Sequence, residues 1–368
     1  MAERLAFLLG KDPSTSHGGD MTMFRTMRAI ASERFLTEVV CLSDDPGRVE
    51  PDVIRLPKPA ISIPRLAASA LVRRRSLVHT RFDVDSVRDA VESLAADRYV
   101  AVHSYMAEPY LRAAGARPGQ DLLVSTEVPE SIVWRRTHGP AGWLEGRRLR
   151  RDELRVASAA RALGGYDRDE MDTLRTAGFD ARWLPMTLPP ASTVDVANSP
   201  PRLVLLGNRT WRPNAAAAES MLRLWPRIAA DVTDAELVIV GPPPSGATSR
   251  DLPAGVTDLG FVDRVDDVLA GCRAMVAPVT VGGGVRVKLL EAAARGLPVV
   301  ATAPAIGSIE ASVGMTPSSD EDDFVARCRA YLLDAELAAG AGAELHAANA
   351  RRWSDRVGQD AVLGWLAS

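Results

Sequence analysis

Cysteine is scarce in this chain, and the few cysteines present are far apart. The 368 residues contain three, Cys41, Cys272 and Cys328, and no two of them have the Cys-x-x-Cys spacing of a zinc or redox motif. An odd number of widely spaced cysteines does not suggest a disulfide framework. We therefore expect free thiols in a reducing compartment.

Long apolar runs and a strong excess of one charge are also lacking. No stretch approaches the roughly 18 apolar residues of a membrane span, and the apolar run at the N-terminus is too short for a signal peptide. A net charge of −3 argues against a dedicated nucleic-acid binder. We therefore expect a cytoplasmic globular protein.

Short apolar runs alternate with longer segments of helical character, and the runs are continuously apolar, as in strands covered on both faces. This alternation predicts an α/β protein with doubly wound parallel sheets. The expected strands are 5–9, 38–43, 99–103, 121–125, 182–186, 203–206, 237–240, 275–279 and 299–301. The expected helices include 21–34, 214–230, 286–295 and 320–334.

One segment interrupts the alternation. Residues 184–201 contain five prolines and little periodicity, which is typical of an interdomain linker. The length of the chain suits two domains. We predict a first domain over 1–185, a linker over 186–201 and a second domain over 202–350. At the chain end, apolar residues share one face of a helix expected over 353–368.

A glycine-rich stretch over 281–291 is the most informative motif. Three glycines (Gly282, Gly283 and Gly284) let a backbone approach a ligand closely, and the helix start that follows offers free N–H groups to an anion. Lys288 adds a positive charge, and Glu291 can accept hydrogen bonds from hydroxyls. A ligand that is anionic at one end and rich in hydroxyls at the other is a nucleotide diphosphate attached to a sugar.

The stretch resembles the nucleotide-sugar loop of retaining glycosyltransferases with the GT-B fold, family 4 type (glycosyl transferases group 1). The resemblance continues, in the family's order, in Leu203–Asn214, Leu237–Pro242 and Leu259–Val262. It implies two Rossmann-like domains that face each other across a cleft, with the last helix crossing back to the first domain. It also implies a nucleotide-diphosphate sugar (UDP-, GDP- or dTDP-sugar) as donor, and retention of configuration.

The resemblance assigns the donor site to the second domain. Glu291 would bind the ribose hydroxyls, although a glutamate near a helix start is also a favourable dipole partner. The family's second glutamate is replaced here by Gly283, which leaves recognition of the donor sugar open. The remaining donor-binding candidates are Arg212, Phe261, Val262, Gly282, Gly284, Val285 and Arg286. Arg209 and Lys288 are candidate catalytic cations for the leaving diphosphate.

Candidates in the first domain follow its expected strands, where ligands bind in open α/β sheets. Gly18 and Gly19 would lie under the donor phosphates or the acceptor, and Asp20 would bind the acceptor; a plain turn is the alternative. His103 is a candidate catalytic residue that would contact the donor sugar, or an ordinary histidine at a strand end. Glu127 is a candidate for binding an acceptor hydroxyl.

Basic runs stand apart from these motifs, at 73–75, 134–136 and 147–151, with Trp134 and Trp143 beside them. A solvated helix face is the simplest interpretation. With their tryptophans, the runs could instead hold the protein on an anionic lipid surface at the inner membrane, or bind a phosphorylated acceptor.

The sequence therefore predicts a glycosyltransferase that moves a sugar from a nucleotide-diphosphate donor to the hydroxyl of a glycan, glycolipid or secondary metabolite. No metal-ligand spacing is found, so we expect no required metal or other cofactor. The alternatives are a nucleotide-sugar epimerase or a sugar phosphorylase on the same scaffold, or a non-catalytic nucleotide-sugar-binding protein.

Overall fold

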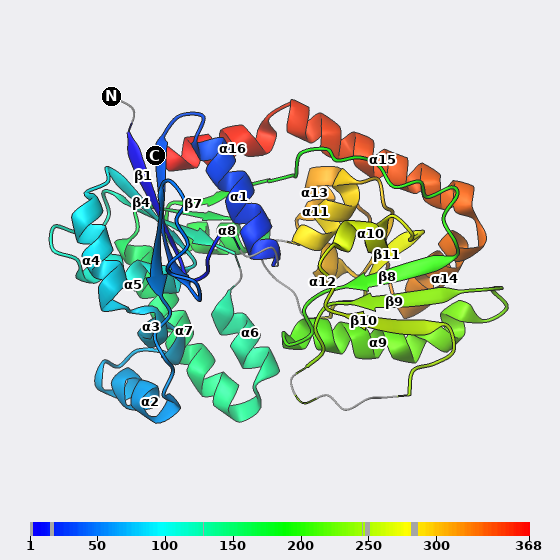
Figure 1. Ribbon diagram of the computed structural model, residues 1–368, viewed down its shortest axis with the longest axis horizontal. Helices are drawn as coiled ribbons and strands as arrows, with labels where there is room; N and C mark the ends of the chain where they lie inside the picture. The colour runs from blue at the N-terminus through cyan, green and yellow to red at the C-terminus, as the bar shows by residue number, and fades with distance from the viewer. Residues whose placement is uncertain (1–2, 15–17, 128, 245, 247–250, 281–285) are drawn as a thin grey trace. The chain divides into compact units, whose positions relative to one another are not determined.

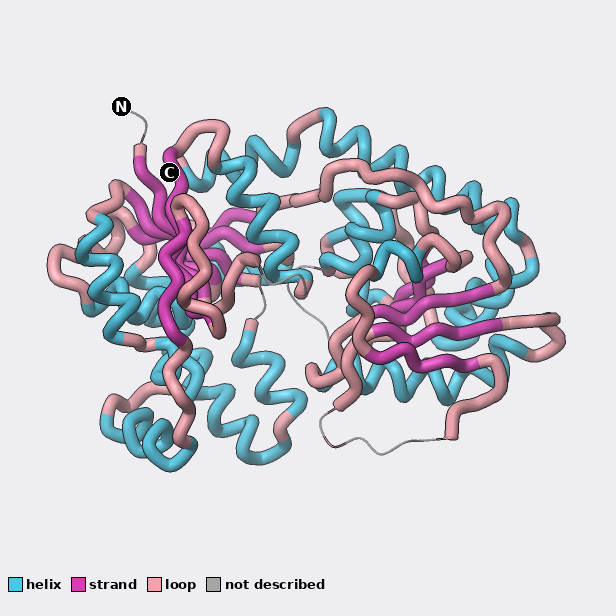
Figure 2. The backbone as a smooth tube through the Cα atoms, in the orientation of Figure 1, coloured by secondary structure: helices cyan, strands magenta, loops and turns pink. Residues whose placement is uncertain are grey.

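The computed structural model describes residues 3–14, 18–127, 129–244, 246, 251–280 and 286–368. The chain forms two compact units. The first comprises residues 1–184 together with 359–368, and the second comprises residues 185–358. Each has strands at its centre and helices around them (Figures 1 and 2).

Within the described residues, the first unit contains a sheet of seven strands, all parallel, in the order β3-β2-β1-β4-β5-β6-β7. The chain builds outward from β1 through β2 to β3, and then returns to the other side of β1 with β4. The strands are β1 (Arg4–Leu9), β2 (Leu36–Ser43), β3 (Val53–Pro57), β4 (Arg98–Val102), β5 (Leu122–Thr126), β6 (Ala162–Gly165) and β7 (Ala181–Trp183).

Helices cover both faces of this sheet (Figure 1). On one face, Phe24 packs edge-on against Phe7 of β1. On the other, α4, α5, α7 and α8 contribute to one apolar cluster. The helices are α1 (Gly19–Ala31), α2 (Ile63–Val72), α3 (Leu77–Phe82), α4 (Asp85–Leu94), η1 (Ser104–Met106, a 3-10 helix), α5 (Ala107–Arg112), α6 (Glu130–Thr137), α7 (Gly139–Ala159) and α8 (Arg168–Thr176).

The second unit contains, in its described part, a sheet of five parallel strands in the order β10-β9-β8-β11-β12. Its core packs Trp225 and Phe324 against the buried side chains of the sheet. The strands are β8 (Arg202–Leu206), β9 (Glu236–Val240), β10 (Val256–Gly260), β11 (Ala274–Ala277) and β12 (Val299–Ala301). The helices are α9 (Arg212–Ala229), α10 (Val265–Leu269), α11 (Val287–Ala294), α12 (Ala303–Ile306), α13 (Ile309–Val313), α14 (Glu321–Leu333) and α15 (Ala335–Ser354).

The predicted α/β architecture with parallel sheets is confirmed. The proline-rich segment contains no strand or helix, but it is well packed within the second unit. The N–H groups of Ala191 and Val194 donate to the carbonyl groups of Ala294 and Arg295, at 2.9 and 2.8 Å. Backbone hydrogen bonds therefore hold the middle of the segment to α11 and the residue that follows it.

The chain end differs in detail from the single helix that periodicity predicts. Helix α15 ends at Ser354, Arg356 adopts a left-handed conformation (φ 58°), and α16 (Val357–Leu366) follows. A non-glycine residue with positive φ cannot continue an α-helix. Trp365 of α16 is fully buried and packs on Gly164 of β6. The last ten residues thus complete the core of the first unit.

Candidate functional site

Lys288 is the central cation of a small pocket in the second unit. It lies in the first turn of α11, and its Nζ atom donates to Oδ1 of Asn214, which belongs to α9, at 2.9 Å. Gly207 and Arg209 also line the pocket, which lies at the carboxyl ends of β8 and β9. Ligands bind at this edge in open α/β sheets, beside the point where the strand order reverses.

Burial disfavours the charged form of Lys288. It lowers the pKa of the ammonium group to about 8, and the neighbouring Glu291 opposes that shift. An anion placed in the pocket would restore the charged form by direct attraction. Lys288 is therefore suited to holding a negatively charged ligand at or below neutral pH.

Arg209 is nearly buried and already holds a carboxylate. Its Nη1 and Nη2 atoms donate to the two carboxylate oxygens of Asp258 in β10, both at 2.6 Å, and Nη2 also reaches the carbonyl of Gly241 at 2.6 Å. The ion pair lowers the pKa of Asp258. Both Nη atoms of Arg209 are engaged by protein atoms, and its buried Nε atom has no partner among the described residues. Arg209 therefore fixes the loop after β8, and Lys288 is the other cation of the pocket.

The backbone forms the floor of this pocket. Gly241 follows β9 with φ 122°, and a Cβ atom built there would lie 2.1 Å from the carbonyl oxygen of Gly207. Only glycine fits such an approach. The two strand ends therefore lie close together.

The other predicted donor residues lie in separate places around the second unit. Glu291 is partly buried on α11, one turn beyond Lys288. The guanidinium group of Arg286 lies against Gly307, and Arg212 is exposed at the start of α9. Phe261 is half-exposed just beyond β10, with Val262 beside it. Gly282, Gly283, Gly284 and Val285 lie outside the described residues.

His103 follows β4 in the first unit and has an unusual backbone. Its φ of 73° is a conformation that non-glycine residues rarely adopt. The imidazole stacks on the Tyr105 ring, with centroids 5.0 Å apart and planes 10° apart. Burial lowers the pKa of His103 to about 4, so the ring is neutral at physiological pH. A neutral imidazole can both donate and accept hydrogen bonds.

Glu127 lies beside His103, at the end of the next strand. Its Oε2 atom is 3.5 Å from Nε2 of the histidine, and its side chain is 1% exposed. Burial raises the pKa of this carboxyl group well above its ordinary value, which favours its protonated form. Its Oε1 atom has no hydrogen-bond partner among the described residues. The neutral His103 is partly exposed to the cavity, and the Glu127 side chain is buried beside it.

The loop after β1 contributes the remaining predicted residues. Gly18 caps α1 with φ 120°, and a Cβ atom there would lie 2.4 Å from the Asp20 carboxylate. Gly19 is the first residue of the helix, and Asp20 accepts a hydrogen bond from Nζ of Lys11 at 2.5 Å. Asp20 and His103 line the same cavity, of about 250 Å³.

Sequence reasoning missed several residues of that cavity, among them Lys58, Arg81 and Tyr105. Lys58 follows β3 directly, but this strand was not among those expected from the sequence, so the strand-end rule could not select it. Arg81 and Tyr105 lie in short helices without a motif. No group of three metal-ligating side chains that could hold an ion occurs in the described part of the chain. None of its helices combines the length and apolar character of a membrane span.

Comparisons with known proteins agree with this arrangement. Residues 200–334 match the family model of glycosyl transferases group 1. A search of curated proteins gives no match. Many solved structures are similar over nearly the whole chain, and three of them illustrate the range.

Sucrose-phosphate synthase from Thermosynechococcus elongatus has a TM-score of 0.72 and 16% identity, and the alignment covers 99% of this chain and 98% of that one. HepE of Anabaena, solved with UDP and glucose, has a TM-score of 0.65 and 14% identity, with all of both chains covered. WaaG, a glycosyltransferase of lipopolysaccharide biosynthesis, has a TM-score of 0.63 and 15% identity, with coverage of 99% and 100%. These likenesses show the GT-B fold.

Proposed function

We propose that this chain, a glycosyltransferase of the GT-B fold whose residues 200–334 match glycosyl transferases group 1, works with retention and without a metal. It moves a sugar from a nucleotide-diphosphate donor to an acceptor. In the proposal the second unit holds the donor and the first holds the acceptor. The position of Lys288 at the carboxyl ends of the strands, inside the matched segment, is the observation that carries this assignment.

The chemistry requires positive charge where the diphosphate leaves. As the bond between the anomeric carbon and the diphosphate oxygen breaks, negative charge grows on that oxygen, and a cation held beside it lowers the barrier. In the proposed mechanism Lys288 supplies that charge. The acceptor oxygen bonds to the anomeric carbon on the face that the diphosphate leaves, and its proton passes to a diphosphate oxygen. Such a step needs no side-chain nucleophile.

The other donor contacts are proposals of the same kind. Glu291 would accept hydrogen bonds from the ribose hydroxyls, and Phe261 with Val262 would lie against the base. Arg212 and Arg286 would face the phosphates, together with the glycine-rich loop. In the first unit, neutral His103 would contact the donor sugar, while Asp20 and Glu127 would bind acceptor hydroxyls beside Gly18 and Gly19.

Calorimetry with UDP, GDP, dTDP and ADP tests the donor assignment. Glu291→Ala should weaken binding of the preferred nucleotide by roughly 1.5–3 kcal/mol, which is about 10- to 150-fold, because the ribose hydroxyls lose a charged acceptor. Glu310→Ala, which removes an exposed glutamate of the same unit, is the matched control and should change nothing. Equal affinities for the two variants would remove Glu291 from the site.

Measurements of turnover distinguish a glycosyltransferase from a non-catalytic binding protein and test whether a metal is required. We expect slow hydrolysis of the preferred nucleotide sugar in the absence of an acceptor, and the same rate in EDTA. Loss of turnover in EDTA that magnesium restores would contradict metal independence. Tight nucleotide binding with neither hydrolysis nor transfer would favour a non-catalytic binding protein.

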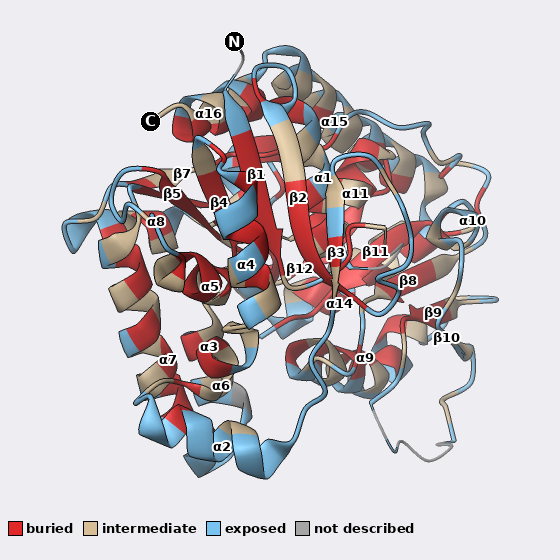
Figure 3. Cartoon of the chain, turned by 60° about the vertical axis from the view of Figure 1, so that its left-hand side comes forward, coloured by how far each residue is buried: buried red, intermediate tan, exposed pale blue. Residues whose placement is uncertain are grey.

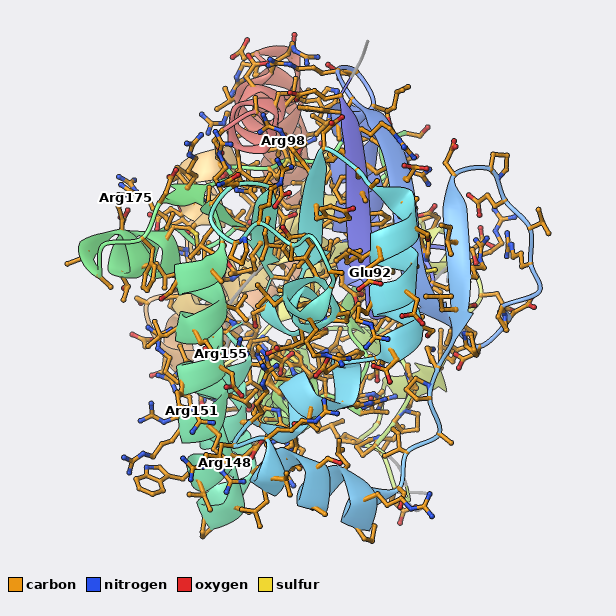
Figure 4. The ribbon with its side chains drawn as sticks, turned by 90° about the vertical axis from the view of Figure 1, so that its left-hand side faces the viewer. Glu92, Arg98, Arg148, Arg151, Arg155 and Arg175 are labelled. Atoms are coloured by element: carbon orange, nitrogen blue, oxygen red, sulfur yellow. The ribbon has the colours of Figure 1, made fainter. Side chains whose placement is uncertain are left out.

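We also propose that the first unit contacts an anionic membrane surface. Helix α2 is mostly apolar, yet Ala70 is its only buried residue, and Ile63, Leu71 and Val72 are at least 66% exposed (Figure 3). Arginines follow this helix at 73–75, and Arg151 of α7 donates to the carbonyl of Arg74; Figure 4 labels Arg151 together with Arg148 of the same helix. Exposed apolar side chains among arginines suit a layer of anionic lipids.

Sedimentation with lipid vesicles tests this contact. The protein should bind vesicles that contain phosphatidylglycerol and not vesicles of phosphatidylcholine alone, and salt should weaken the binding. Leu71→Glu with Val72→Glu should abolish it. Leu36→Glu, at an exposed leucine of β2, is the control. Binding that survives the double substitution would contradict the proposal.

A further inference from the structure

The cavity of about 250 Å³ in the first unit lies where the strand order of the sheet reverses. Gly10 and Lys11 follow β1, His103 follows β4, and these strands are neighbours from which the chain builds in opposite directions. Crevices at such reversal points are the usual ligand sites of open α/β sheets. The position therefore marks a binding site that belongs to the first unit alone.

The lining of this cavity is strongly positive, although the protein as a whole is acidic. Three cations come from three different elements: Lys11 after β1, Lys58 after β3, and Arg81 of α3. Among the lining residues that the structure describes, the carboxylate is Asp20, which binds Lys11. Lys58 pairs with Asp44, a side chain that is 80% exposed and outside the lining. These described lining residues have a formal excess of two positive charges, of which Asp44 balances one from outside the cavity.

Arg81 is the cation of this lining whose hydrogen-bond donors are not used by another described residue. Its guanidinium group lies 5.3 Å from the centroid of the Phe82 ring, is exposed to solvent, and makes no ion pair or hydrogen bond with another described residue. A planar guanidinium group can bind two oxygens of one phosphate at the same time. An anion in the cavity would give Arg81 its missing acceptor.

One wall of the cavity is aromatic. Phe82 stacks on Tyr105 with centroids 4.3 Å apart, and Tyr105 stacks in turn on His103. Tyr105 is stacked between the other two rings, so Phe82 and His103 are the rings whose outer surfaces can pack against the C–H groups of a sugar, while the cations around them attract charge. The volume lies below the roughly 300–1,000 Å³ of sites for larger ligands. A single sugar ring or a short polyol therefore suits the space.

We propose that this cavity binds the acceptor as a phosphomonoester of a small polyhydroxyl compound, with Arg81 and Lys58 holding the phosphate. A phosphomonoester carries about −1.5 to −2 charges at neutral pH, which matches the excess in the lining, whereas a carboxylate carries only one. Asp20 would then accept a hydrogen bond from a hydroxyl of the same molecule. The inference rests on the proposed function, because it identifies the chemical class of that enzyme's acceptor.

Calorimetry on the full chain, without nucleotide, tests the inference. The probes are glucose 6-phosphate, fructose 6-phosphate and glycerol 3-phosphate, compared with glucose and glucuronate. At least one phosphomonoester should bind at least tenfold more tightly than glucose and glucuronate, and salt should weaken it. Arg81→Gln should weaken that binding about tenfold or more, and Lys58→Gln should act in the same direction.

Arg34→Gln is a matched control. Arg34 is exposed in the same unit and lies 5.8 Å from the centroid of the adjacent Phe35 ring, as Arg81 lies over Phe82, but it is not part of the cavity. Its substitution should leave sugar-phosphate binding unchanged. Equal losses in the Arg34 and Arg81 variants would point to a general effect of surface charge and would overturn the proposal.

A second experiment, with lipid vesicles, identifies whether the phosphate comes from a soluble compound or from a lipid. Vesicles that contain phosphatidic acid replace the soluble probes, and binding there that Arg81→Gln abolishes would support the same phosphomonoester chemistry on a lipid acceptor. Binding of neither soluble nor lipid phosphates would overturn the inference. Nucleotide binding, measured on the same samples, reports separately on the donor site: the donor assignment stands if UDP or another nucleotide binds while every phosphomonoester fails.

Discussion

Glu127, buried beside His103, sets the electrostatics at one edge of the first sheet. Burial raises the pKa of Glu127 and favours its protonated form in the folded chain, whereas in the unfolded chain it ionises near its ordinary value of 4.5. The folded state therefore binds more protons between these two pKa values. Stability is fully present below about 4.5 and falls as the pH rises toward the raised pKa.

Glu127→Gln tests this directly, because the amide has the shape of the acid and does not ionise. The free energy of unfolding of the wild type should fall relative to that of the variant by up to about 1.4 kcal/mol per pH unit above 4.5. Urea titrations at pH 5 and pH 7.5 measure the difference. Glu130, whose pKa burial raises to about 7, contributes to both proteins and cancels. Parallel pH curves for the two proteins would show that Glu127 is ionised.

Lys288 should make the affinity for a nucleoside diphosphate depend on pH. Its pKa is about 8 in the free protein and should be higher when a diphosphate lies beside it. The affinity for the preferred nucleoside diphosphate should be constant below pH 8 and then decrease, by up to about tenfold per pH unit. Lys288→Arg should remove this decrease between pH 7 and 9.5, because arginine stays charged. A wild-type profile that is flat to pH 9.5 would contradict the role of Lys288.

A strand-end rule selected His103 and Asp20 from the sequence, and a glycine-rich loop before a helix selected Lys288; the roles of all three stay predictions. These rules did not reveal their partners. Arg209 has the sequence position of a phosphate ligand, but the bidentate pair with Asp258 spans 49 residues and depends on where β10 lies in the sheet. Such a contact follows from the packing of the sheet, which the local sequence does not contain.

Among the secondary-structure elements, the continuously apolar strands were predicted and the atypical ones were not. Strand β6 has only four residues, two of them glycine, and β10 is largely exposed and contains Asp258. Strand β3 has an arginine, Arg55, at its buried position, where it pairs with Asp12 at 2.8 Å. These strands form because a neighbouring strand supplies backbone hydrogen-bond partners. Their own amino-acid composition is therefore a poor predictor of strand structure.

Helix α16 is the element whose removal should be most costly to the first unit. Trp365→Ala should lower the free energy of unfolding by about 3–5 kcal/mol, because it leaves a large cavity against Gly164. Trp143→Ala, which truncates a half-exposed tryptophan in the same unit, should cost about 0.5 kcal/mol or less. Thermal or urea unfolding compares them. Equal costs would mean that α16 is not docked as described.

The assembled chain carries its two proposed sites in two different units, and hydrogen exchange can separate them. A saturating nucleoside diphosphate should slow exchange mainly in peptides from 185–358. A bound phosphomonoester should slow it mainly in peptides from 1–184. At about 100 times its dissociation constant, each ligand should add roughly 2.7 kcal/mol of stability to the state that binds it. Protection by both ligands in the same peptides would contradict the assignment of separate sites.

The sequence-based prediction of the fold succeeded for the chain as a whole because strand and helix alternate with a regular period. The class of reaction was predictable because one motif set recurs in order over the second half. The positive cavity was not predictable, since Lys58 and Arg81 are 47 and 70 residues beyond Lys11 along the chain. The parallel register of β3, β2 and β1 brings Lys58 near Lys11, and the packing of α3 adds Arg81.

The return of the last ten residues makes the second unit an insertion within the chain of the first. Its two ends are adjacent, since a Cβ atom on Gly358 would lie 3.0 Å from the carbonyl oxygen of Pro185. Residues 185–358 can therefore be expressed by cutting the gene at two points. A stop codon after Leu184 would instead yield a first unit with an open core, so its expression requires a short peptide that joins Leu184 to Gln359. For the same reason, a purification tag is better placed at the N-terminus.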